Sequence, residues 1–226
     1  LRLGSTGNNC TAVGSTVLTN NTADNNTGLG FLALKLNTTG TQNTALGAQA
    51  LDANTTGNYN IGIGQDALGA NTTASSNVTV GVSSLTFNTT GANNTGLGHA
   101  ALMSNTTASN NTGLGYSALS QNTTGTANTA VGHDALKANT TAGNNAAFGQ
   151  KALQSNTTGA TNTALGTHTM LSNSTGSENV AVGTSTLEDN TTGSNNVGVG
   201  RSALASNTTG IENVAVGRNA LSAITT

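Results

Sequence analysis

The chain has 226 residues, of which 6% are charged and 2% aromatic, with 30 glycines, no proline and a formal net charge of −2. So few cations and aromatic rings exclude a phosphate-binding stripe and a base-stacking platform, so nucleic-acid binding is not expected. No run of about eighteen apolar residues and no charged leader is present, so we expect neither a membrane span nor a signal peptide in this segment.

A glycine recurs every seventeen residues from Gly30 to Gly217, after a first step of sixteen from Gly14. The unit reads G-x-x-A-L-x-x-N-T-T-G-x-x-N-T-A-L, and thirteen glycines mark thirteen copies. A fixed short period indicates one structural unit stacked on copies of itself. In the short first copy, Asn20 still lies seventeen residues before Asn37, which predicts that the missing residue falls between Gly14 and Asn20.

The polar, low-complexity composition also fits a flexible linker, because little apolar surface is available to offset the entropy of ordering. The apolar residues nevertheless stand in register along the repeat, which a disordered chain does not need. Both ends interrupt a unit, since Leu1 falls on its fifth position and Thr226 on its tenth. We therefore expect residues 1–226 to form a single repeat domain that is a segment of a longer fibre.

Each unit, numbered from its glycine, contains a predicted strand that begins at position 14 and ends at the next glycine, as in residues 43–47. Large and small residues alternate there in steps of two, which is the period of a strand. A turn of this length accommodates two short strands, with corners at the glycines of positions 1 and 11 and the asparagine of position 8. The predicted fold class is all-β, a parallel β-solenoid or β-roll with 17-residue turns and about thirteen turns.

Small side chains predominate in two further rows of the repeat, positions 4 and 16, as in Ala33, Ala45 and Gly62, and neither row contains a charged residue. Position 17 is apolar in every copy, and position 5 is leucine except for Met170. If positions 5 and 17 point into the coil, strand alternation aims positions 4 and 16 outward, where small residues favour close packing of a second or third copy of the chain. The alternative is a coil so narrow that only small side chains fit inside it at these positions.

Asparagine fills position 14 in twelve copies, and Cys10 takes its place in the first. Like residues stack in a parallel solenoid, so each amide can donate to one neighbour and accept from the other. The predicted structural asparagine ladder consists of Asn26, Asn43, Asn60, Asn77, Asn94, Asn111, Asn128, Asn145, Asn162, Asn179, Asn196 and Asn213.

A second asparagine row begins the N-T-T stretch at position 8, where every asparagine is also an N-x-[ST] acceptor for N-linked glycan. Position 14 lacks this pattern except at Asn77, so a recurring asparagine does not by itself require an acceptor motif. Position 9 is also threonine in nearly every copy. At position 10, threonine remains in Thr226 even where Ile224 replaces the asparagine, which favours a structural role for the position-10 threonine. The glycosylation candidates are Asn20, Asn37, Asn54, Asn71, Asn88, Asn105, Asn122, Asn139, Asn156, Asn173, Asn190 and Asn207.

Residues that could carry catalysis or bind a metal are scattered. His99 and His133 share position 2 but lie two turns apart, about 9–10 Å on stacked strands, which is too far for one metal ion, and His168 stands at position 3. The eight carboxylates form neither an acid–base pair nor a calcium-binding row. Recurring Gly-x-Gly stretches never open a helix, and the single Cys10 excludes an internal disulfide. We expect no enzyme activity, no metal site and no cofactor.

The stretches 179–183 and 213–217, both N-V-A-V-G, resemble the N-S-V-A-I-G strands of the YadA-like head of trimeric autotransporter adhesins. The whole unit is similar to the repeats of many bacterial and phage tail-fibre-domain proteins, over essentially the entire chain. This resemblance implies a left-handed parallel β-roll, usually a homotrimer, that acts in attachment outside the cell or on a virion, with the N-V-A-V-G strand on the trimer side. Those adhesin heads have shorter turns and lack an N-T-T corner in every turn.

Three functions remain open. The first is a non-catalytic structural segment of an extracellular, cell-surface or virion fibre, with self-association as a homotrimer or fibre and with glycans or a host surface receptor as partners. The second is an N-glycosylated extracellular filament that presents one glycan per turn at position 8. The third is an ice-binding solenoid, which needs a flat threonine array, whereas positions 9 and 10 are adjacent and row 15 is interrupted by Ile61 and Val78. The first is the predicted function.

Overall fold

The computed structural model describes residues 6–226, and the chain forms two compact units whose boundary in the sequence falls between Asn111 and Thr112. Unit 1 contains the three-residue strands β1 (Thr11–Val13), β2 (Thr27–Leu29), β3 (Thr44–Leu46), β4 (Ile61–Ile63), β5 (Val78–Val80) and β6 (Thr95–Leu97). Unit 2 contains β7 (Thr112–Leu114), β8 (Thr129–Val131), β9 (Ala146–Phe148), β10 (Thr163–Leu165), β11 (Val180–Val182), β12 (Val197–Val199) and β13 (Val214–Val216).

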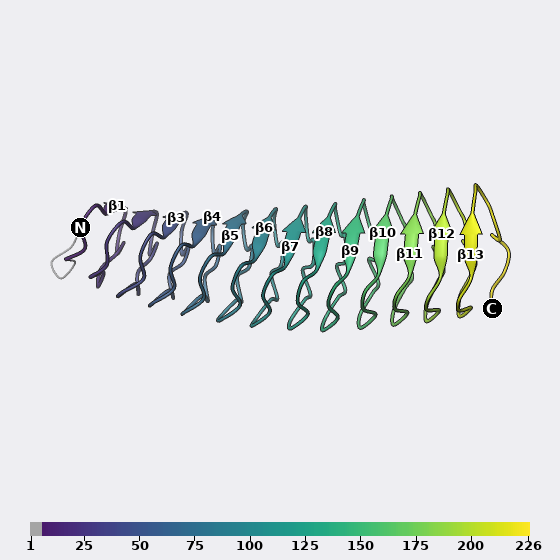
Figure 1. The fold of residues 1–226 in the computed structure, drawn as a ribbon. Helices are drawn as coiled ribbons and strands as arrows, with labels where there is room; N and C mark the ends of the chain where they lie inside the picture. Colours follow the sequence, from purple (N-terminus) through teal and green to yellow (C-terminus); the bar gives the residue numbers. More distant parts are fainter. Residues whose placement is uncertain (1–5) are drawn as a thin grey trace. The chain divides into compact units, whose positions relative to one another are not determined.

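Within each unit, every strand pairs in parallel with the strand one turn further along the chain (Figure 1). The register is like on like, so that Ala45 of β3 lies opposite Gly28 of β2 and Gly62 of β4. In unit 2, Ala164 of β10 lies opposite Ala147 in the same way. The predicted all-β parallel β-solenoid with 17-residue turns is therefore confirmed, with about twelve turns against the thirteen expected.

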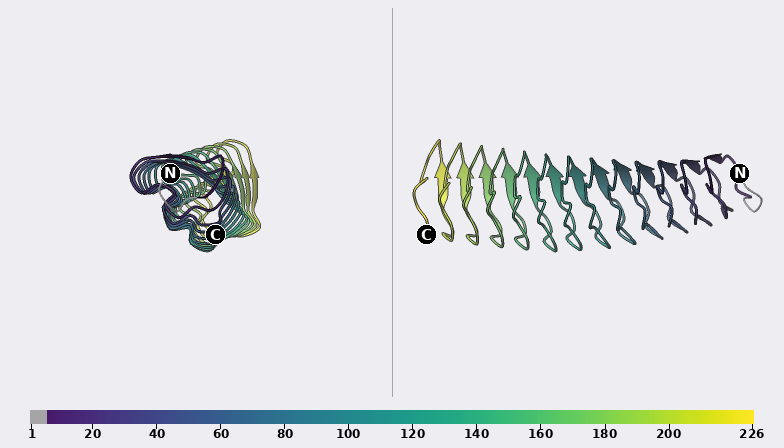
Figure 2. Two further views of the ribbon diagram at one scale, coloured as in Figure 1. Left: turned by 90° about the vertical axis from the view of Figure 1, so that its left-hand side faces the viewer. Right: turned by 180° about the vertical axis from the view of Figure 1, so that it is seen from behind.

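Each turn contains one strand, and the prediction of a second is wrong. Past the strand, the chain follows a series of tight turns that repeats the path of the turn before it, as Figure 2 shows from two further directions. Backbone bonds between turns continue there, since Leu51 donates its N–H to the carbonyl of Ala67 at 3.0 Å and Thr55 donates to Thr72 at 2.8 Å. The stacking is therefore held around the whole turn, although only three residues of it are strand.

Left-handed backbone occurs at unexpected positions of the repeat. The position-1 glycines have positive φ, as predicted, for example 138° at Gly47, but the residues of positions 8 and 11 do not. Instead, positions 3, 5 and 13 adopt φ near 50–60° with ordinary side chains, such as Asp66 at 56°, Leu68 at 55° and Tyr59 at 58°. These tight bends explain why no second strand forms.

A leucine in left-handed backbone at position 5 needs an energetic reason, since that conformation costs a non-glycine residue about 1–2 kcal/mol. Leu51, Leu68 and Leu85 are all fully buried, and complete burial of a leucine side chain contributes about 1.5–3 kcal/mol. The Leu51 carbonyl also accepts the N–H of Asn54 at 3.1 Å, which closes the bend. The free energy gained by burial offsets the cost of the left-handed backbone, which explains how leucine is accommodated at position 5.

Position 13 offers a stabilising substitution. Thr161 is exposed with φ at 60°, and a β-branched residue is poorly suited to that conformation. Thr161→Asn should raise the melting temperature by about 2–4 °C, because asparagine tolerates left-handed backbone and the gain is close to 1 kcal/mol. Circular dichroism on heating measures it, with Thr158→Asn, an exposed threonine of ordinary φ, as the control. Equal effects of the two changes would contradict this explanation.

The inside of the coil differs from the prediction. Ala45 at position 16 is fully buried, whereas Leu46 at position 17 is 41% exposed. The expectation that position 17 points into the coil and position 16 outward is therefore wrong, and the narrow-coil alternative is correct. The interior consists of the small side chains of positions 4 and 16, the leucines of position 5 and the asparagines of positions 8 and 14.

Positions 4 and 16 face each other across this interior. A Cβ placed on Gly96 would lie 2.6 Å from Oγ of Ser84, and one on Gly198 would lie 2.7 Å from Cγ2 of Thr186. Where position 4 is larger than alanine, position 16 is thus a glycine in these turns. The interior is close-packed, so the narrow coil leaves space only for small side chains at position 16.

Candidate functional site

The position-8 asparagines form a continuous hydrogen-bonded row inside each unit. Asn54 is fully buried, and its Nδ2 donates to Oδ1 of Asn37 at 2.7 Å and to the carbonyl of Gly57 at 3.0 Å. In unit 2, Nδ2 of Asn173 donates to Oδ1 of Asn156 at 2.8 Å. The other position-8 side chains, from Asn37 to Asn207, are also fully buried. Both amide hydrogens are therefore used, and every step links one turn to the next.

The position-14 asparagines are linked differently. Oδ1 of Asn43 accepts the backbone N–H of Asn60 at 2.9 Å, and its Nδ2 donates to the carbonyl of Gly57 at 2.8 Å. Each of these side chains therefore bonds mainly to the backbone of the following turn rather than to the next amide. The Gly57 carbonyl accepts from both asparagine rows, so the two rows form one network. In a narrow coil this network pairs polar groups that would otherwise each cost about 1–3 kcal/mol.

Asn20 lies outside this network. It is exposed, and Oδ1 of the buried Asn21 accepts from Nδ2 of Asn37 at 2.6 Å in its place. Nδ2 of Asn21 donates to Ala23, only two residues on, so the missing residue of the first copy lies between Asn21 and Ala23. The prediction that the missing residue lies before Asn20 is therefore wrong, because Asn21 and not Asn20 occupies position 8 of the first copy. A small open hollow at this gap is lined by Thr22, Ala23, Asp24, Thr39 and Thr41.

The geometry bears on glycan attachment. A sugar on Nδ2 of Asn54 would displace a hydrogen bond and would need space inside the coil. In protein from a host with N-linked glycosylation, we expect peptides containing Asn54 or Asn122 to carry unmodified asparagine in mass spectra. The exposed Asn20 serves as the comparison within the same chain, since its acceptor motif is accessible. A glycan mass on Asn54 would contradict the buried ladder geometry.

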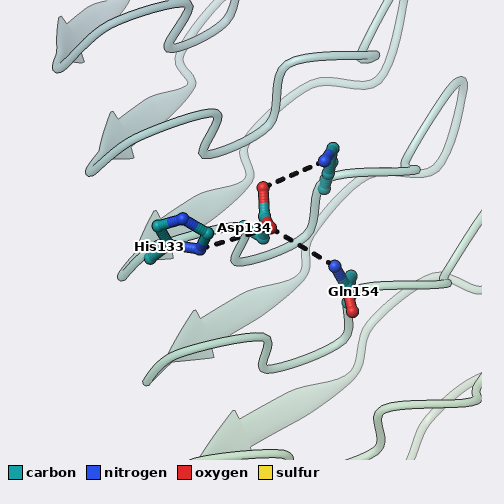
Figure 3. Close-up of polar contacts among 4 residues, drawn as sticks. His133, Asp134 and Gln154 are labelled. Carbon is teal, nitrogen blue, oxygen red and sulfur yellow. Dashed lines mark hydrogen bonds and ion pairs between the residues drawn. The ribbon is translucent and has the colours of Figure 1, made fainter.

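One group of interacting ionisable residues occurs in unit 2 around Asp134, whose side chain is nearly buried (Figure 3). Its carboxylate lies 3.2 Å from Nδ1 of His133 and 3.1 Å from Nζ of Lys137, and Nε2 of Gln154 approaches it at 3.5 Å. The His133 ring stacks on Tyr116 with centroids 5.1 Å apart. The common position 2 of Tyr116 and His133 was the sequence signal for this stack. Oδ1 of this carboxylate is buried and accepts no hydrogen bond, so the ion pair with Lys137 is its one compensating contact among residues 6–226. Because Gln154 belongs to the following turn, the cluster links adjacent turns.

No group of three or more metal-ligating side chains occurs in residues 6–226, and no helix there could cross a membrane. Neither His99 nor His168 therefore belongs to such a group. In unit 1, burial raises the pKa of Asp52, and the charge of Asp66 raises it further, whereas the Ala53 N–H and Lys35 lower it. Within residues 6–226, no ion pair within 4 Å involves Asp52.

Comparison of the chain with protein-family models, with curated proteins and with solved structures found no match. The resemblance to YadA-like and tail-fibre repeats therefore stays a prediction, and the molecule's own surfaces carry the functional reasoning.

A regular surface of each unit is the outward face of the sheet. Its side chains come from positions 15 and 17, which are threonine, alanine or aliphatic at the first and aliphatic or phenylalanine at the second. No strand contains a charged residue. At position 17, the exposed fraction is 42% at Leu29 in unit 1 and 49% at Leu165 in unit 2. We call this surface the sheet face.

Threonine forms a second regular surface at position 10, where residues such as Thr56, Thr73 and Thr141 are exposed. The neighbouring position 9 does not add a parallel row of free hydroxyls, because Oγ1 of Thr55 donates to the Thr72 carbonyl at 3.0 Å and its counterparts do the same. Ice binding needs a flat array of threonines, and a single row of free hydroxyls is not such an array. This surface therefore does not favour an ice-binding function.

Proposed function

We propose that this chain is a non-catalytic structural segment of an extracellular surface fibre, and that copies of it associate through the sheet face. The solenoid is compatible with such a shaft, since each turn is stabilised by its neighbours and the unit can be repeated along an axis. The resemblance to adhesin and tail-fibre repeats supports the extracellular setting. The Asp134 cluster contacts its own turn and the next through His133, Lys137 and Gln154, and we assign it the structural role of linking these turns.

The observation that carries the proposal is the uncharged, largely apolar sheet face in both units. A contiguous apolar surface extending over several strands is unusual on a monomer, where the largest patch covers about 300–600 Å² and is often functional. Strands with buried alanine at position 16 and exposed leucine, valine or phenylalanine at position 17 place their larger apolar groups in water. A second copy of the chain can cover this face, because its own sheet face is apolar and has the same repeat.

Measurement of the mass in solution tests the proposal. Light scattering after size exclusion should give an oligomer for the wild-type chain. The triple variant Leu29→Lys, Leu46→Lys and Val80→Lys should be monomeric, because three ammonium groups would lie in the interface. Its circular dichroism should remain that of the wild type, since all three side chains already contact solvent.

The control places two lysines on exposed apolar residues elsewhere on the surface of unit 1. Leu36 and Phe87 stand at position 7 and are 43% and 53% exposed, so Leu36→Lys with Phe87→Lys should leave the oligomer intact. A wild-type chain that is monomeric at micromolar concentration would refute association through the sheet face. An oligomer that survives the triple variant would show that the sheet face of unit 1 is not needed for association.

A further inference from the structure

We infer that the sheet face of unit 2 has oppositely charged edges that orient the associating copies in parallel, with Glu212 of one copy beside Arg218 of the next. This inference rests on the proposed self-association and adds to it the relative direction of the copies. It concerns unit 2 because the corresponding edge positions of unit 1 contain no carboxylate, lysine or arginine.

The charges lie at the two ends of the strands. Glu178 and Glu212 stand at position 13, two residues before β11 and β13, and form the acidic edge. Arg201 and Arg218 stand at position 2, two residues after β12 and β13, and form the basic edge. The acidic and basic edges are therefore separated by the length of the strand, with the uncharged sheet face between them.

These four residues are unusual for this chain. They include two of its three glutamates and two of its three arginines, in a sequence with only 6% charged residues. All four are exposed, and no ion pair or side-chain hydrogen bond involves them within residues 6–226. By contrast, Asp134 and Lys137 pair with each other within one turn. The edge charges are thus available to a second copy.

Symmetry connects the edges to the direction of the partner. When copies are related by rotation about an axis parallel to the solenoid axis, the acidic edge of each copy meets the basic edge of the next at the same height. Glu212 and Arg218 flank the same strand, β13, so this arrangement pairs them across the interface. When two copies face each other in antiparallel, like edges meet, and glutamates oppose glutamates. Charge complementarity therefore selects the parallel arrangement for two copies or for three.

A charge-exchange experiment tests this pairing by sedimentation at low ionic strength. Glu212→Arg and Arg218→Glu should each weaken association about tenfold, because like charges then meet at the interface. The double exchange Glu212→Arg with Arg218→Glu should restore it to within about threefold of the wild type, and added salt should reduce all the differences. Asp189→Arg makes the same charge change away from both edges and should have little effect.

The outcomes separate the two proposals. A monomeric wild type removes the proposed self-association, and the edge pairing with it. An oligomer that is insensitive to the single exchanges, or is strengthened by Glu212→Arg, overturns the parallel pairing and leaves self-association standing. Weakening by each single change with recovery in the double variant supports the pairing.

A cross-linking experiment measures the direction independently of charge. In a Cys10→Ser background, Val182→Cys and Val216→Cys place thiols on the sheet face at β11 and β13. Parallel copies bring identical residues to the same height, so a short bis-maleimide should link copies in both variants. Antiparallel copies can bring together identical residues at one height at most, so cross-linking of only one variant would overturn the inference.

Discussion

Asn71→Asp should destabilise unit 1 by about 3–5 kcal/mol at neutral pH, the range seen when a buried charge lacks a partner. Nδ2 of Asn71 donates to Oδ1 of Asn54 at 2.8 Å and to the Ala74 carbonyl at 3.1 Å. A carboxylate would turn both contacts into repulsions between oxygens in a fully buried site. It would still accept from Nδ2 of Asn88, but one bond does not offset two lost donors.

The pH dependence has a definite sign. Burial raises the pKa of this engineered carboxyl above its unfolded value of about 3.9, so the penalty grows as the pH rises above about 4. Below that pH both states are protonated, and the acid can donate one of the two lost hydrogen bonds. Thermal melts of Asn71→Asp at a series of pH values check this, with Asn93→Asp as the exposed control in left-handed backbone. Equal stability of the two variants would contradict the buried ladder.

The period determines much of this fold from sequence alone. Because one step of seventeen residues fits nearly the whole chain, like-on-like stacking follows, and the strands are found where N-T-A-L-G predicts them. The left-handed bends at positions 3 and 5 could not be predicted. Residues such as Lys151 and Leu153 have no local preference for that conformation, and they adopt it because the stacked neighbours impose the same path.

Alternation along a strand separates two faces but does not say which is inside. Assigning the larger side chains of position 17 to the interior ignored its width, which is limited because two asparagine rows occupy the same space. A sequence signal was present in the size pairing of positions 4 and 16. Four turns have a residue other than alanine at position 4, namely Val17, Ser84, Thr169 and Thr186, and only the turn of Thr169 lacks glycine at position 16.

The sheet face was hidden from sequence reasoning for the same reason. Because position 17 was assigned to the core, no exposed apolar row was predicted. Self-association was instead inferred from the small residues of position 16. Those residues are buried, so that support is lost. The exposed row at position 17 provides a different argument for self-association. This argument is stronger, because large apolar groups in water favour association more than small ones do.

Adjacent residues of β3 should give opposite results when their sizes are changed. Ala45→Leu should cost about 3 kcal/mol, because overpacking a closed core forces strained side chains or backbone shifts. Gly62 in the neighbouring strand shows how little room exists, since a Cβ there would lie 3.1 Å from the Ala67 carbonyl and 3.4 Å from Cδ1 of Leu51. Three further carbons at Ala45 would have no free volume to enter.

Leu46→Ala should lower the stability of the isolated chain by no more than about 1 kcal/mol, because much of this side chain is already in contact with water. Melting temperatures of both variants are taken in a Leu29→Lys, Val80→Lys background at a concentration where light scattering gives a monomer, so that association does not contribute to the difference. If position 17 were the core, the order would reverse, and Leu46→Ala would cost about 2–5 kcal/mol. That reversed order would overturn both the narrow interior and the sheet face, because both follow from the direction in which these two side chains point.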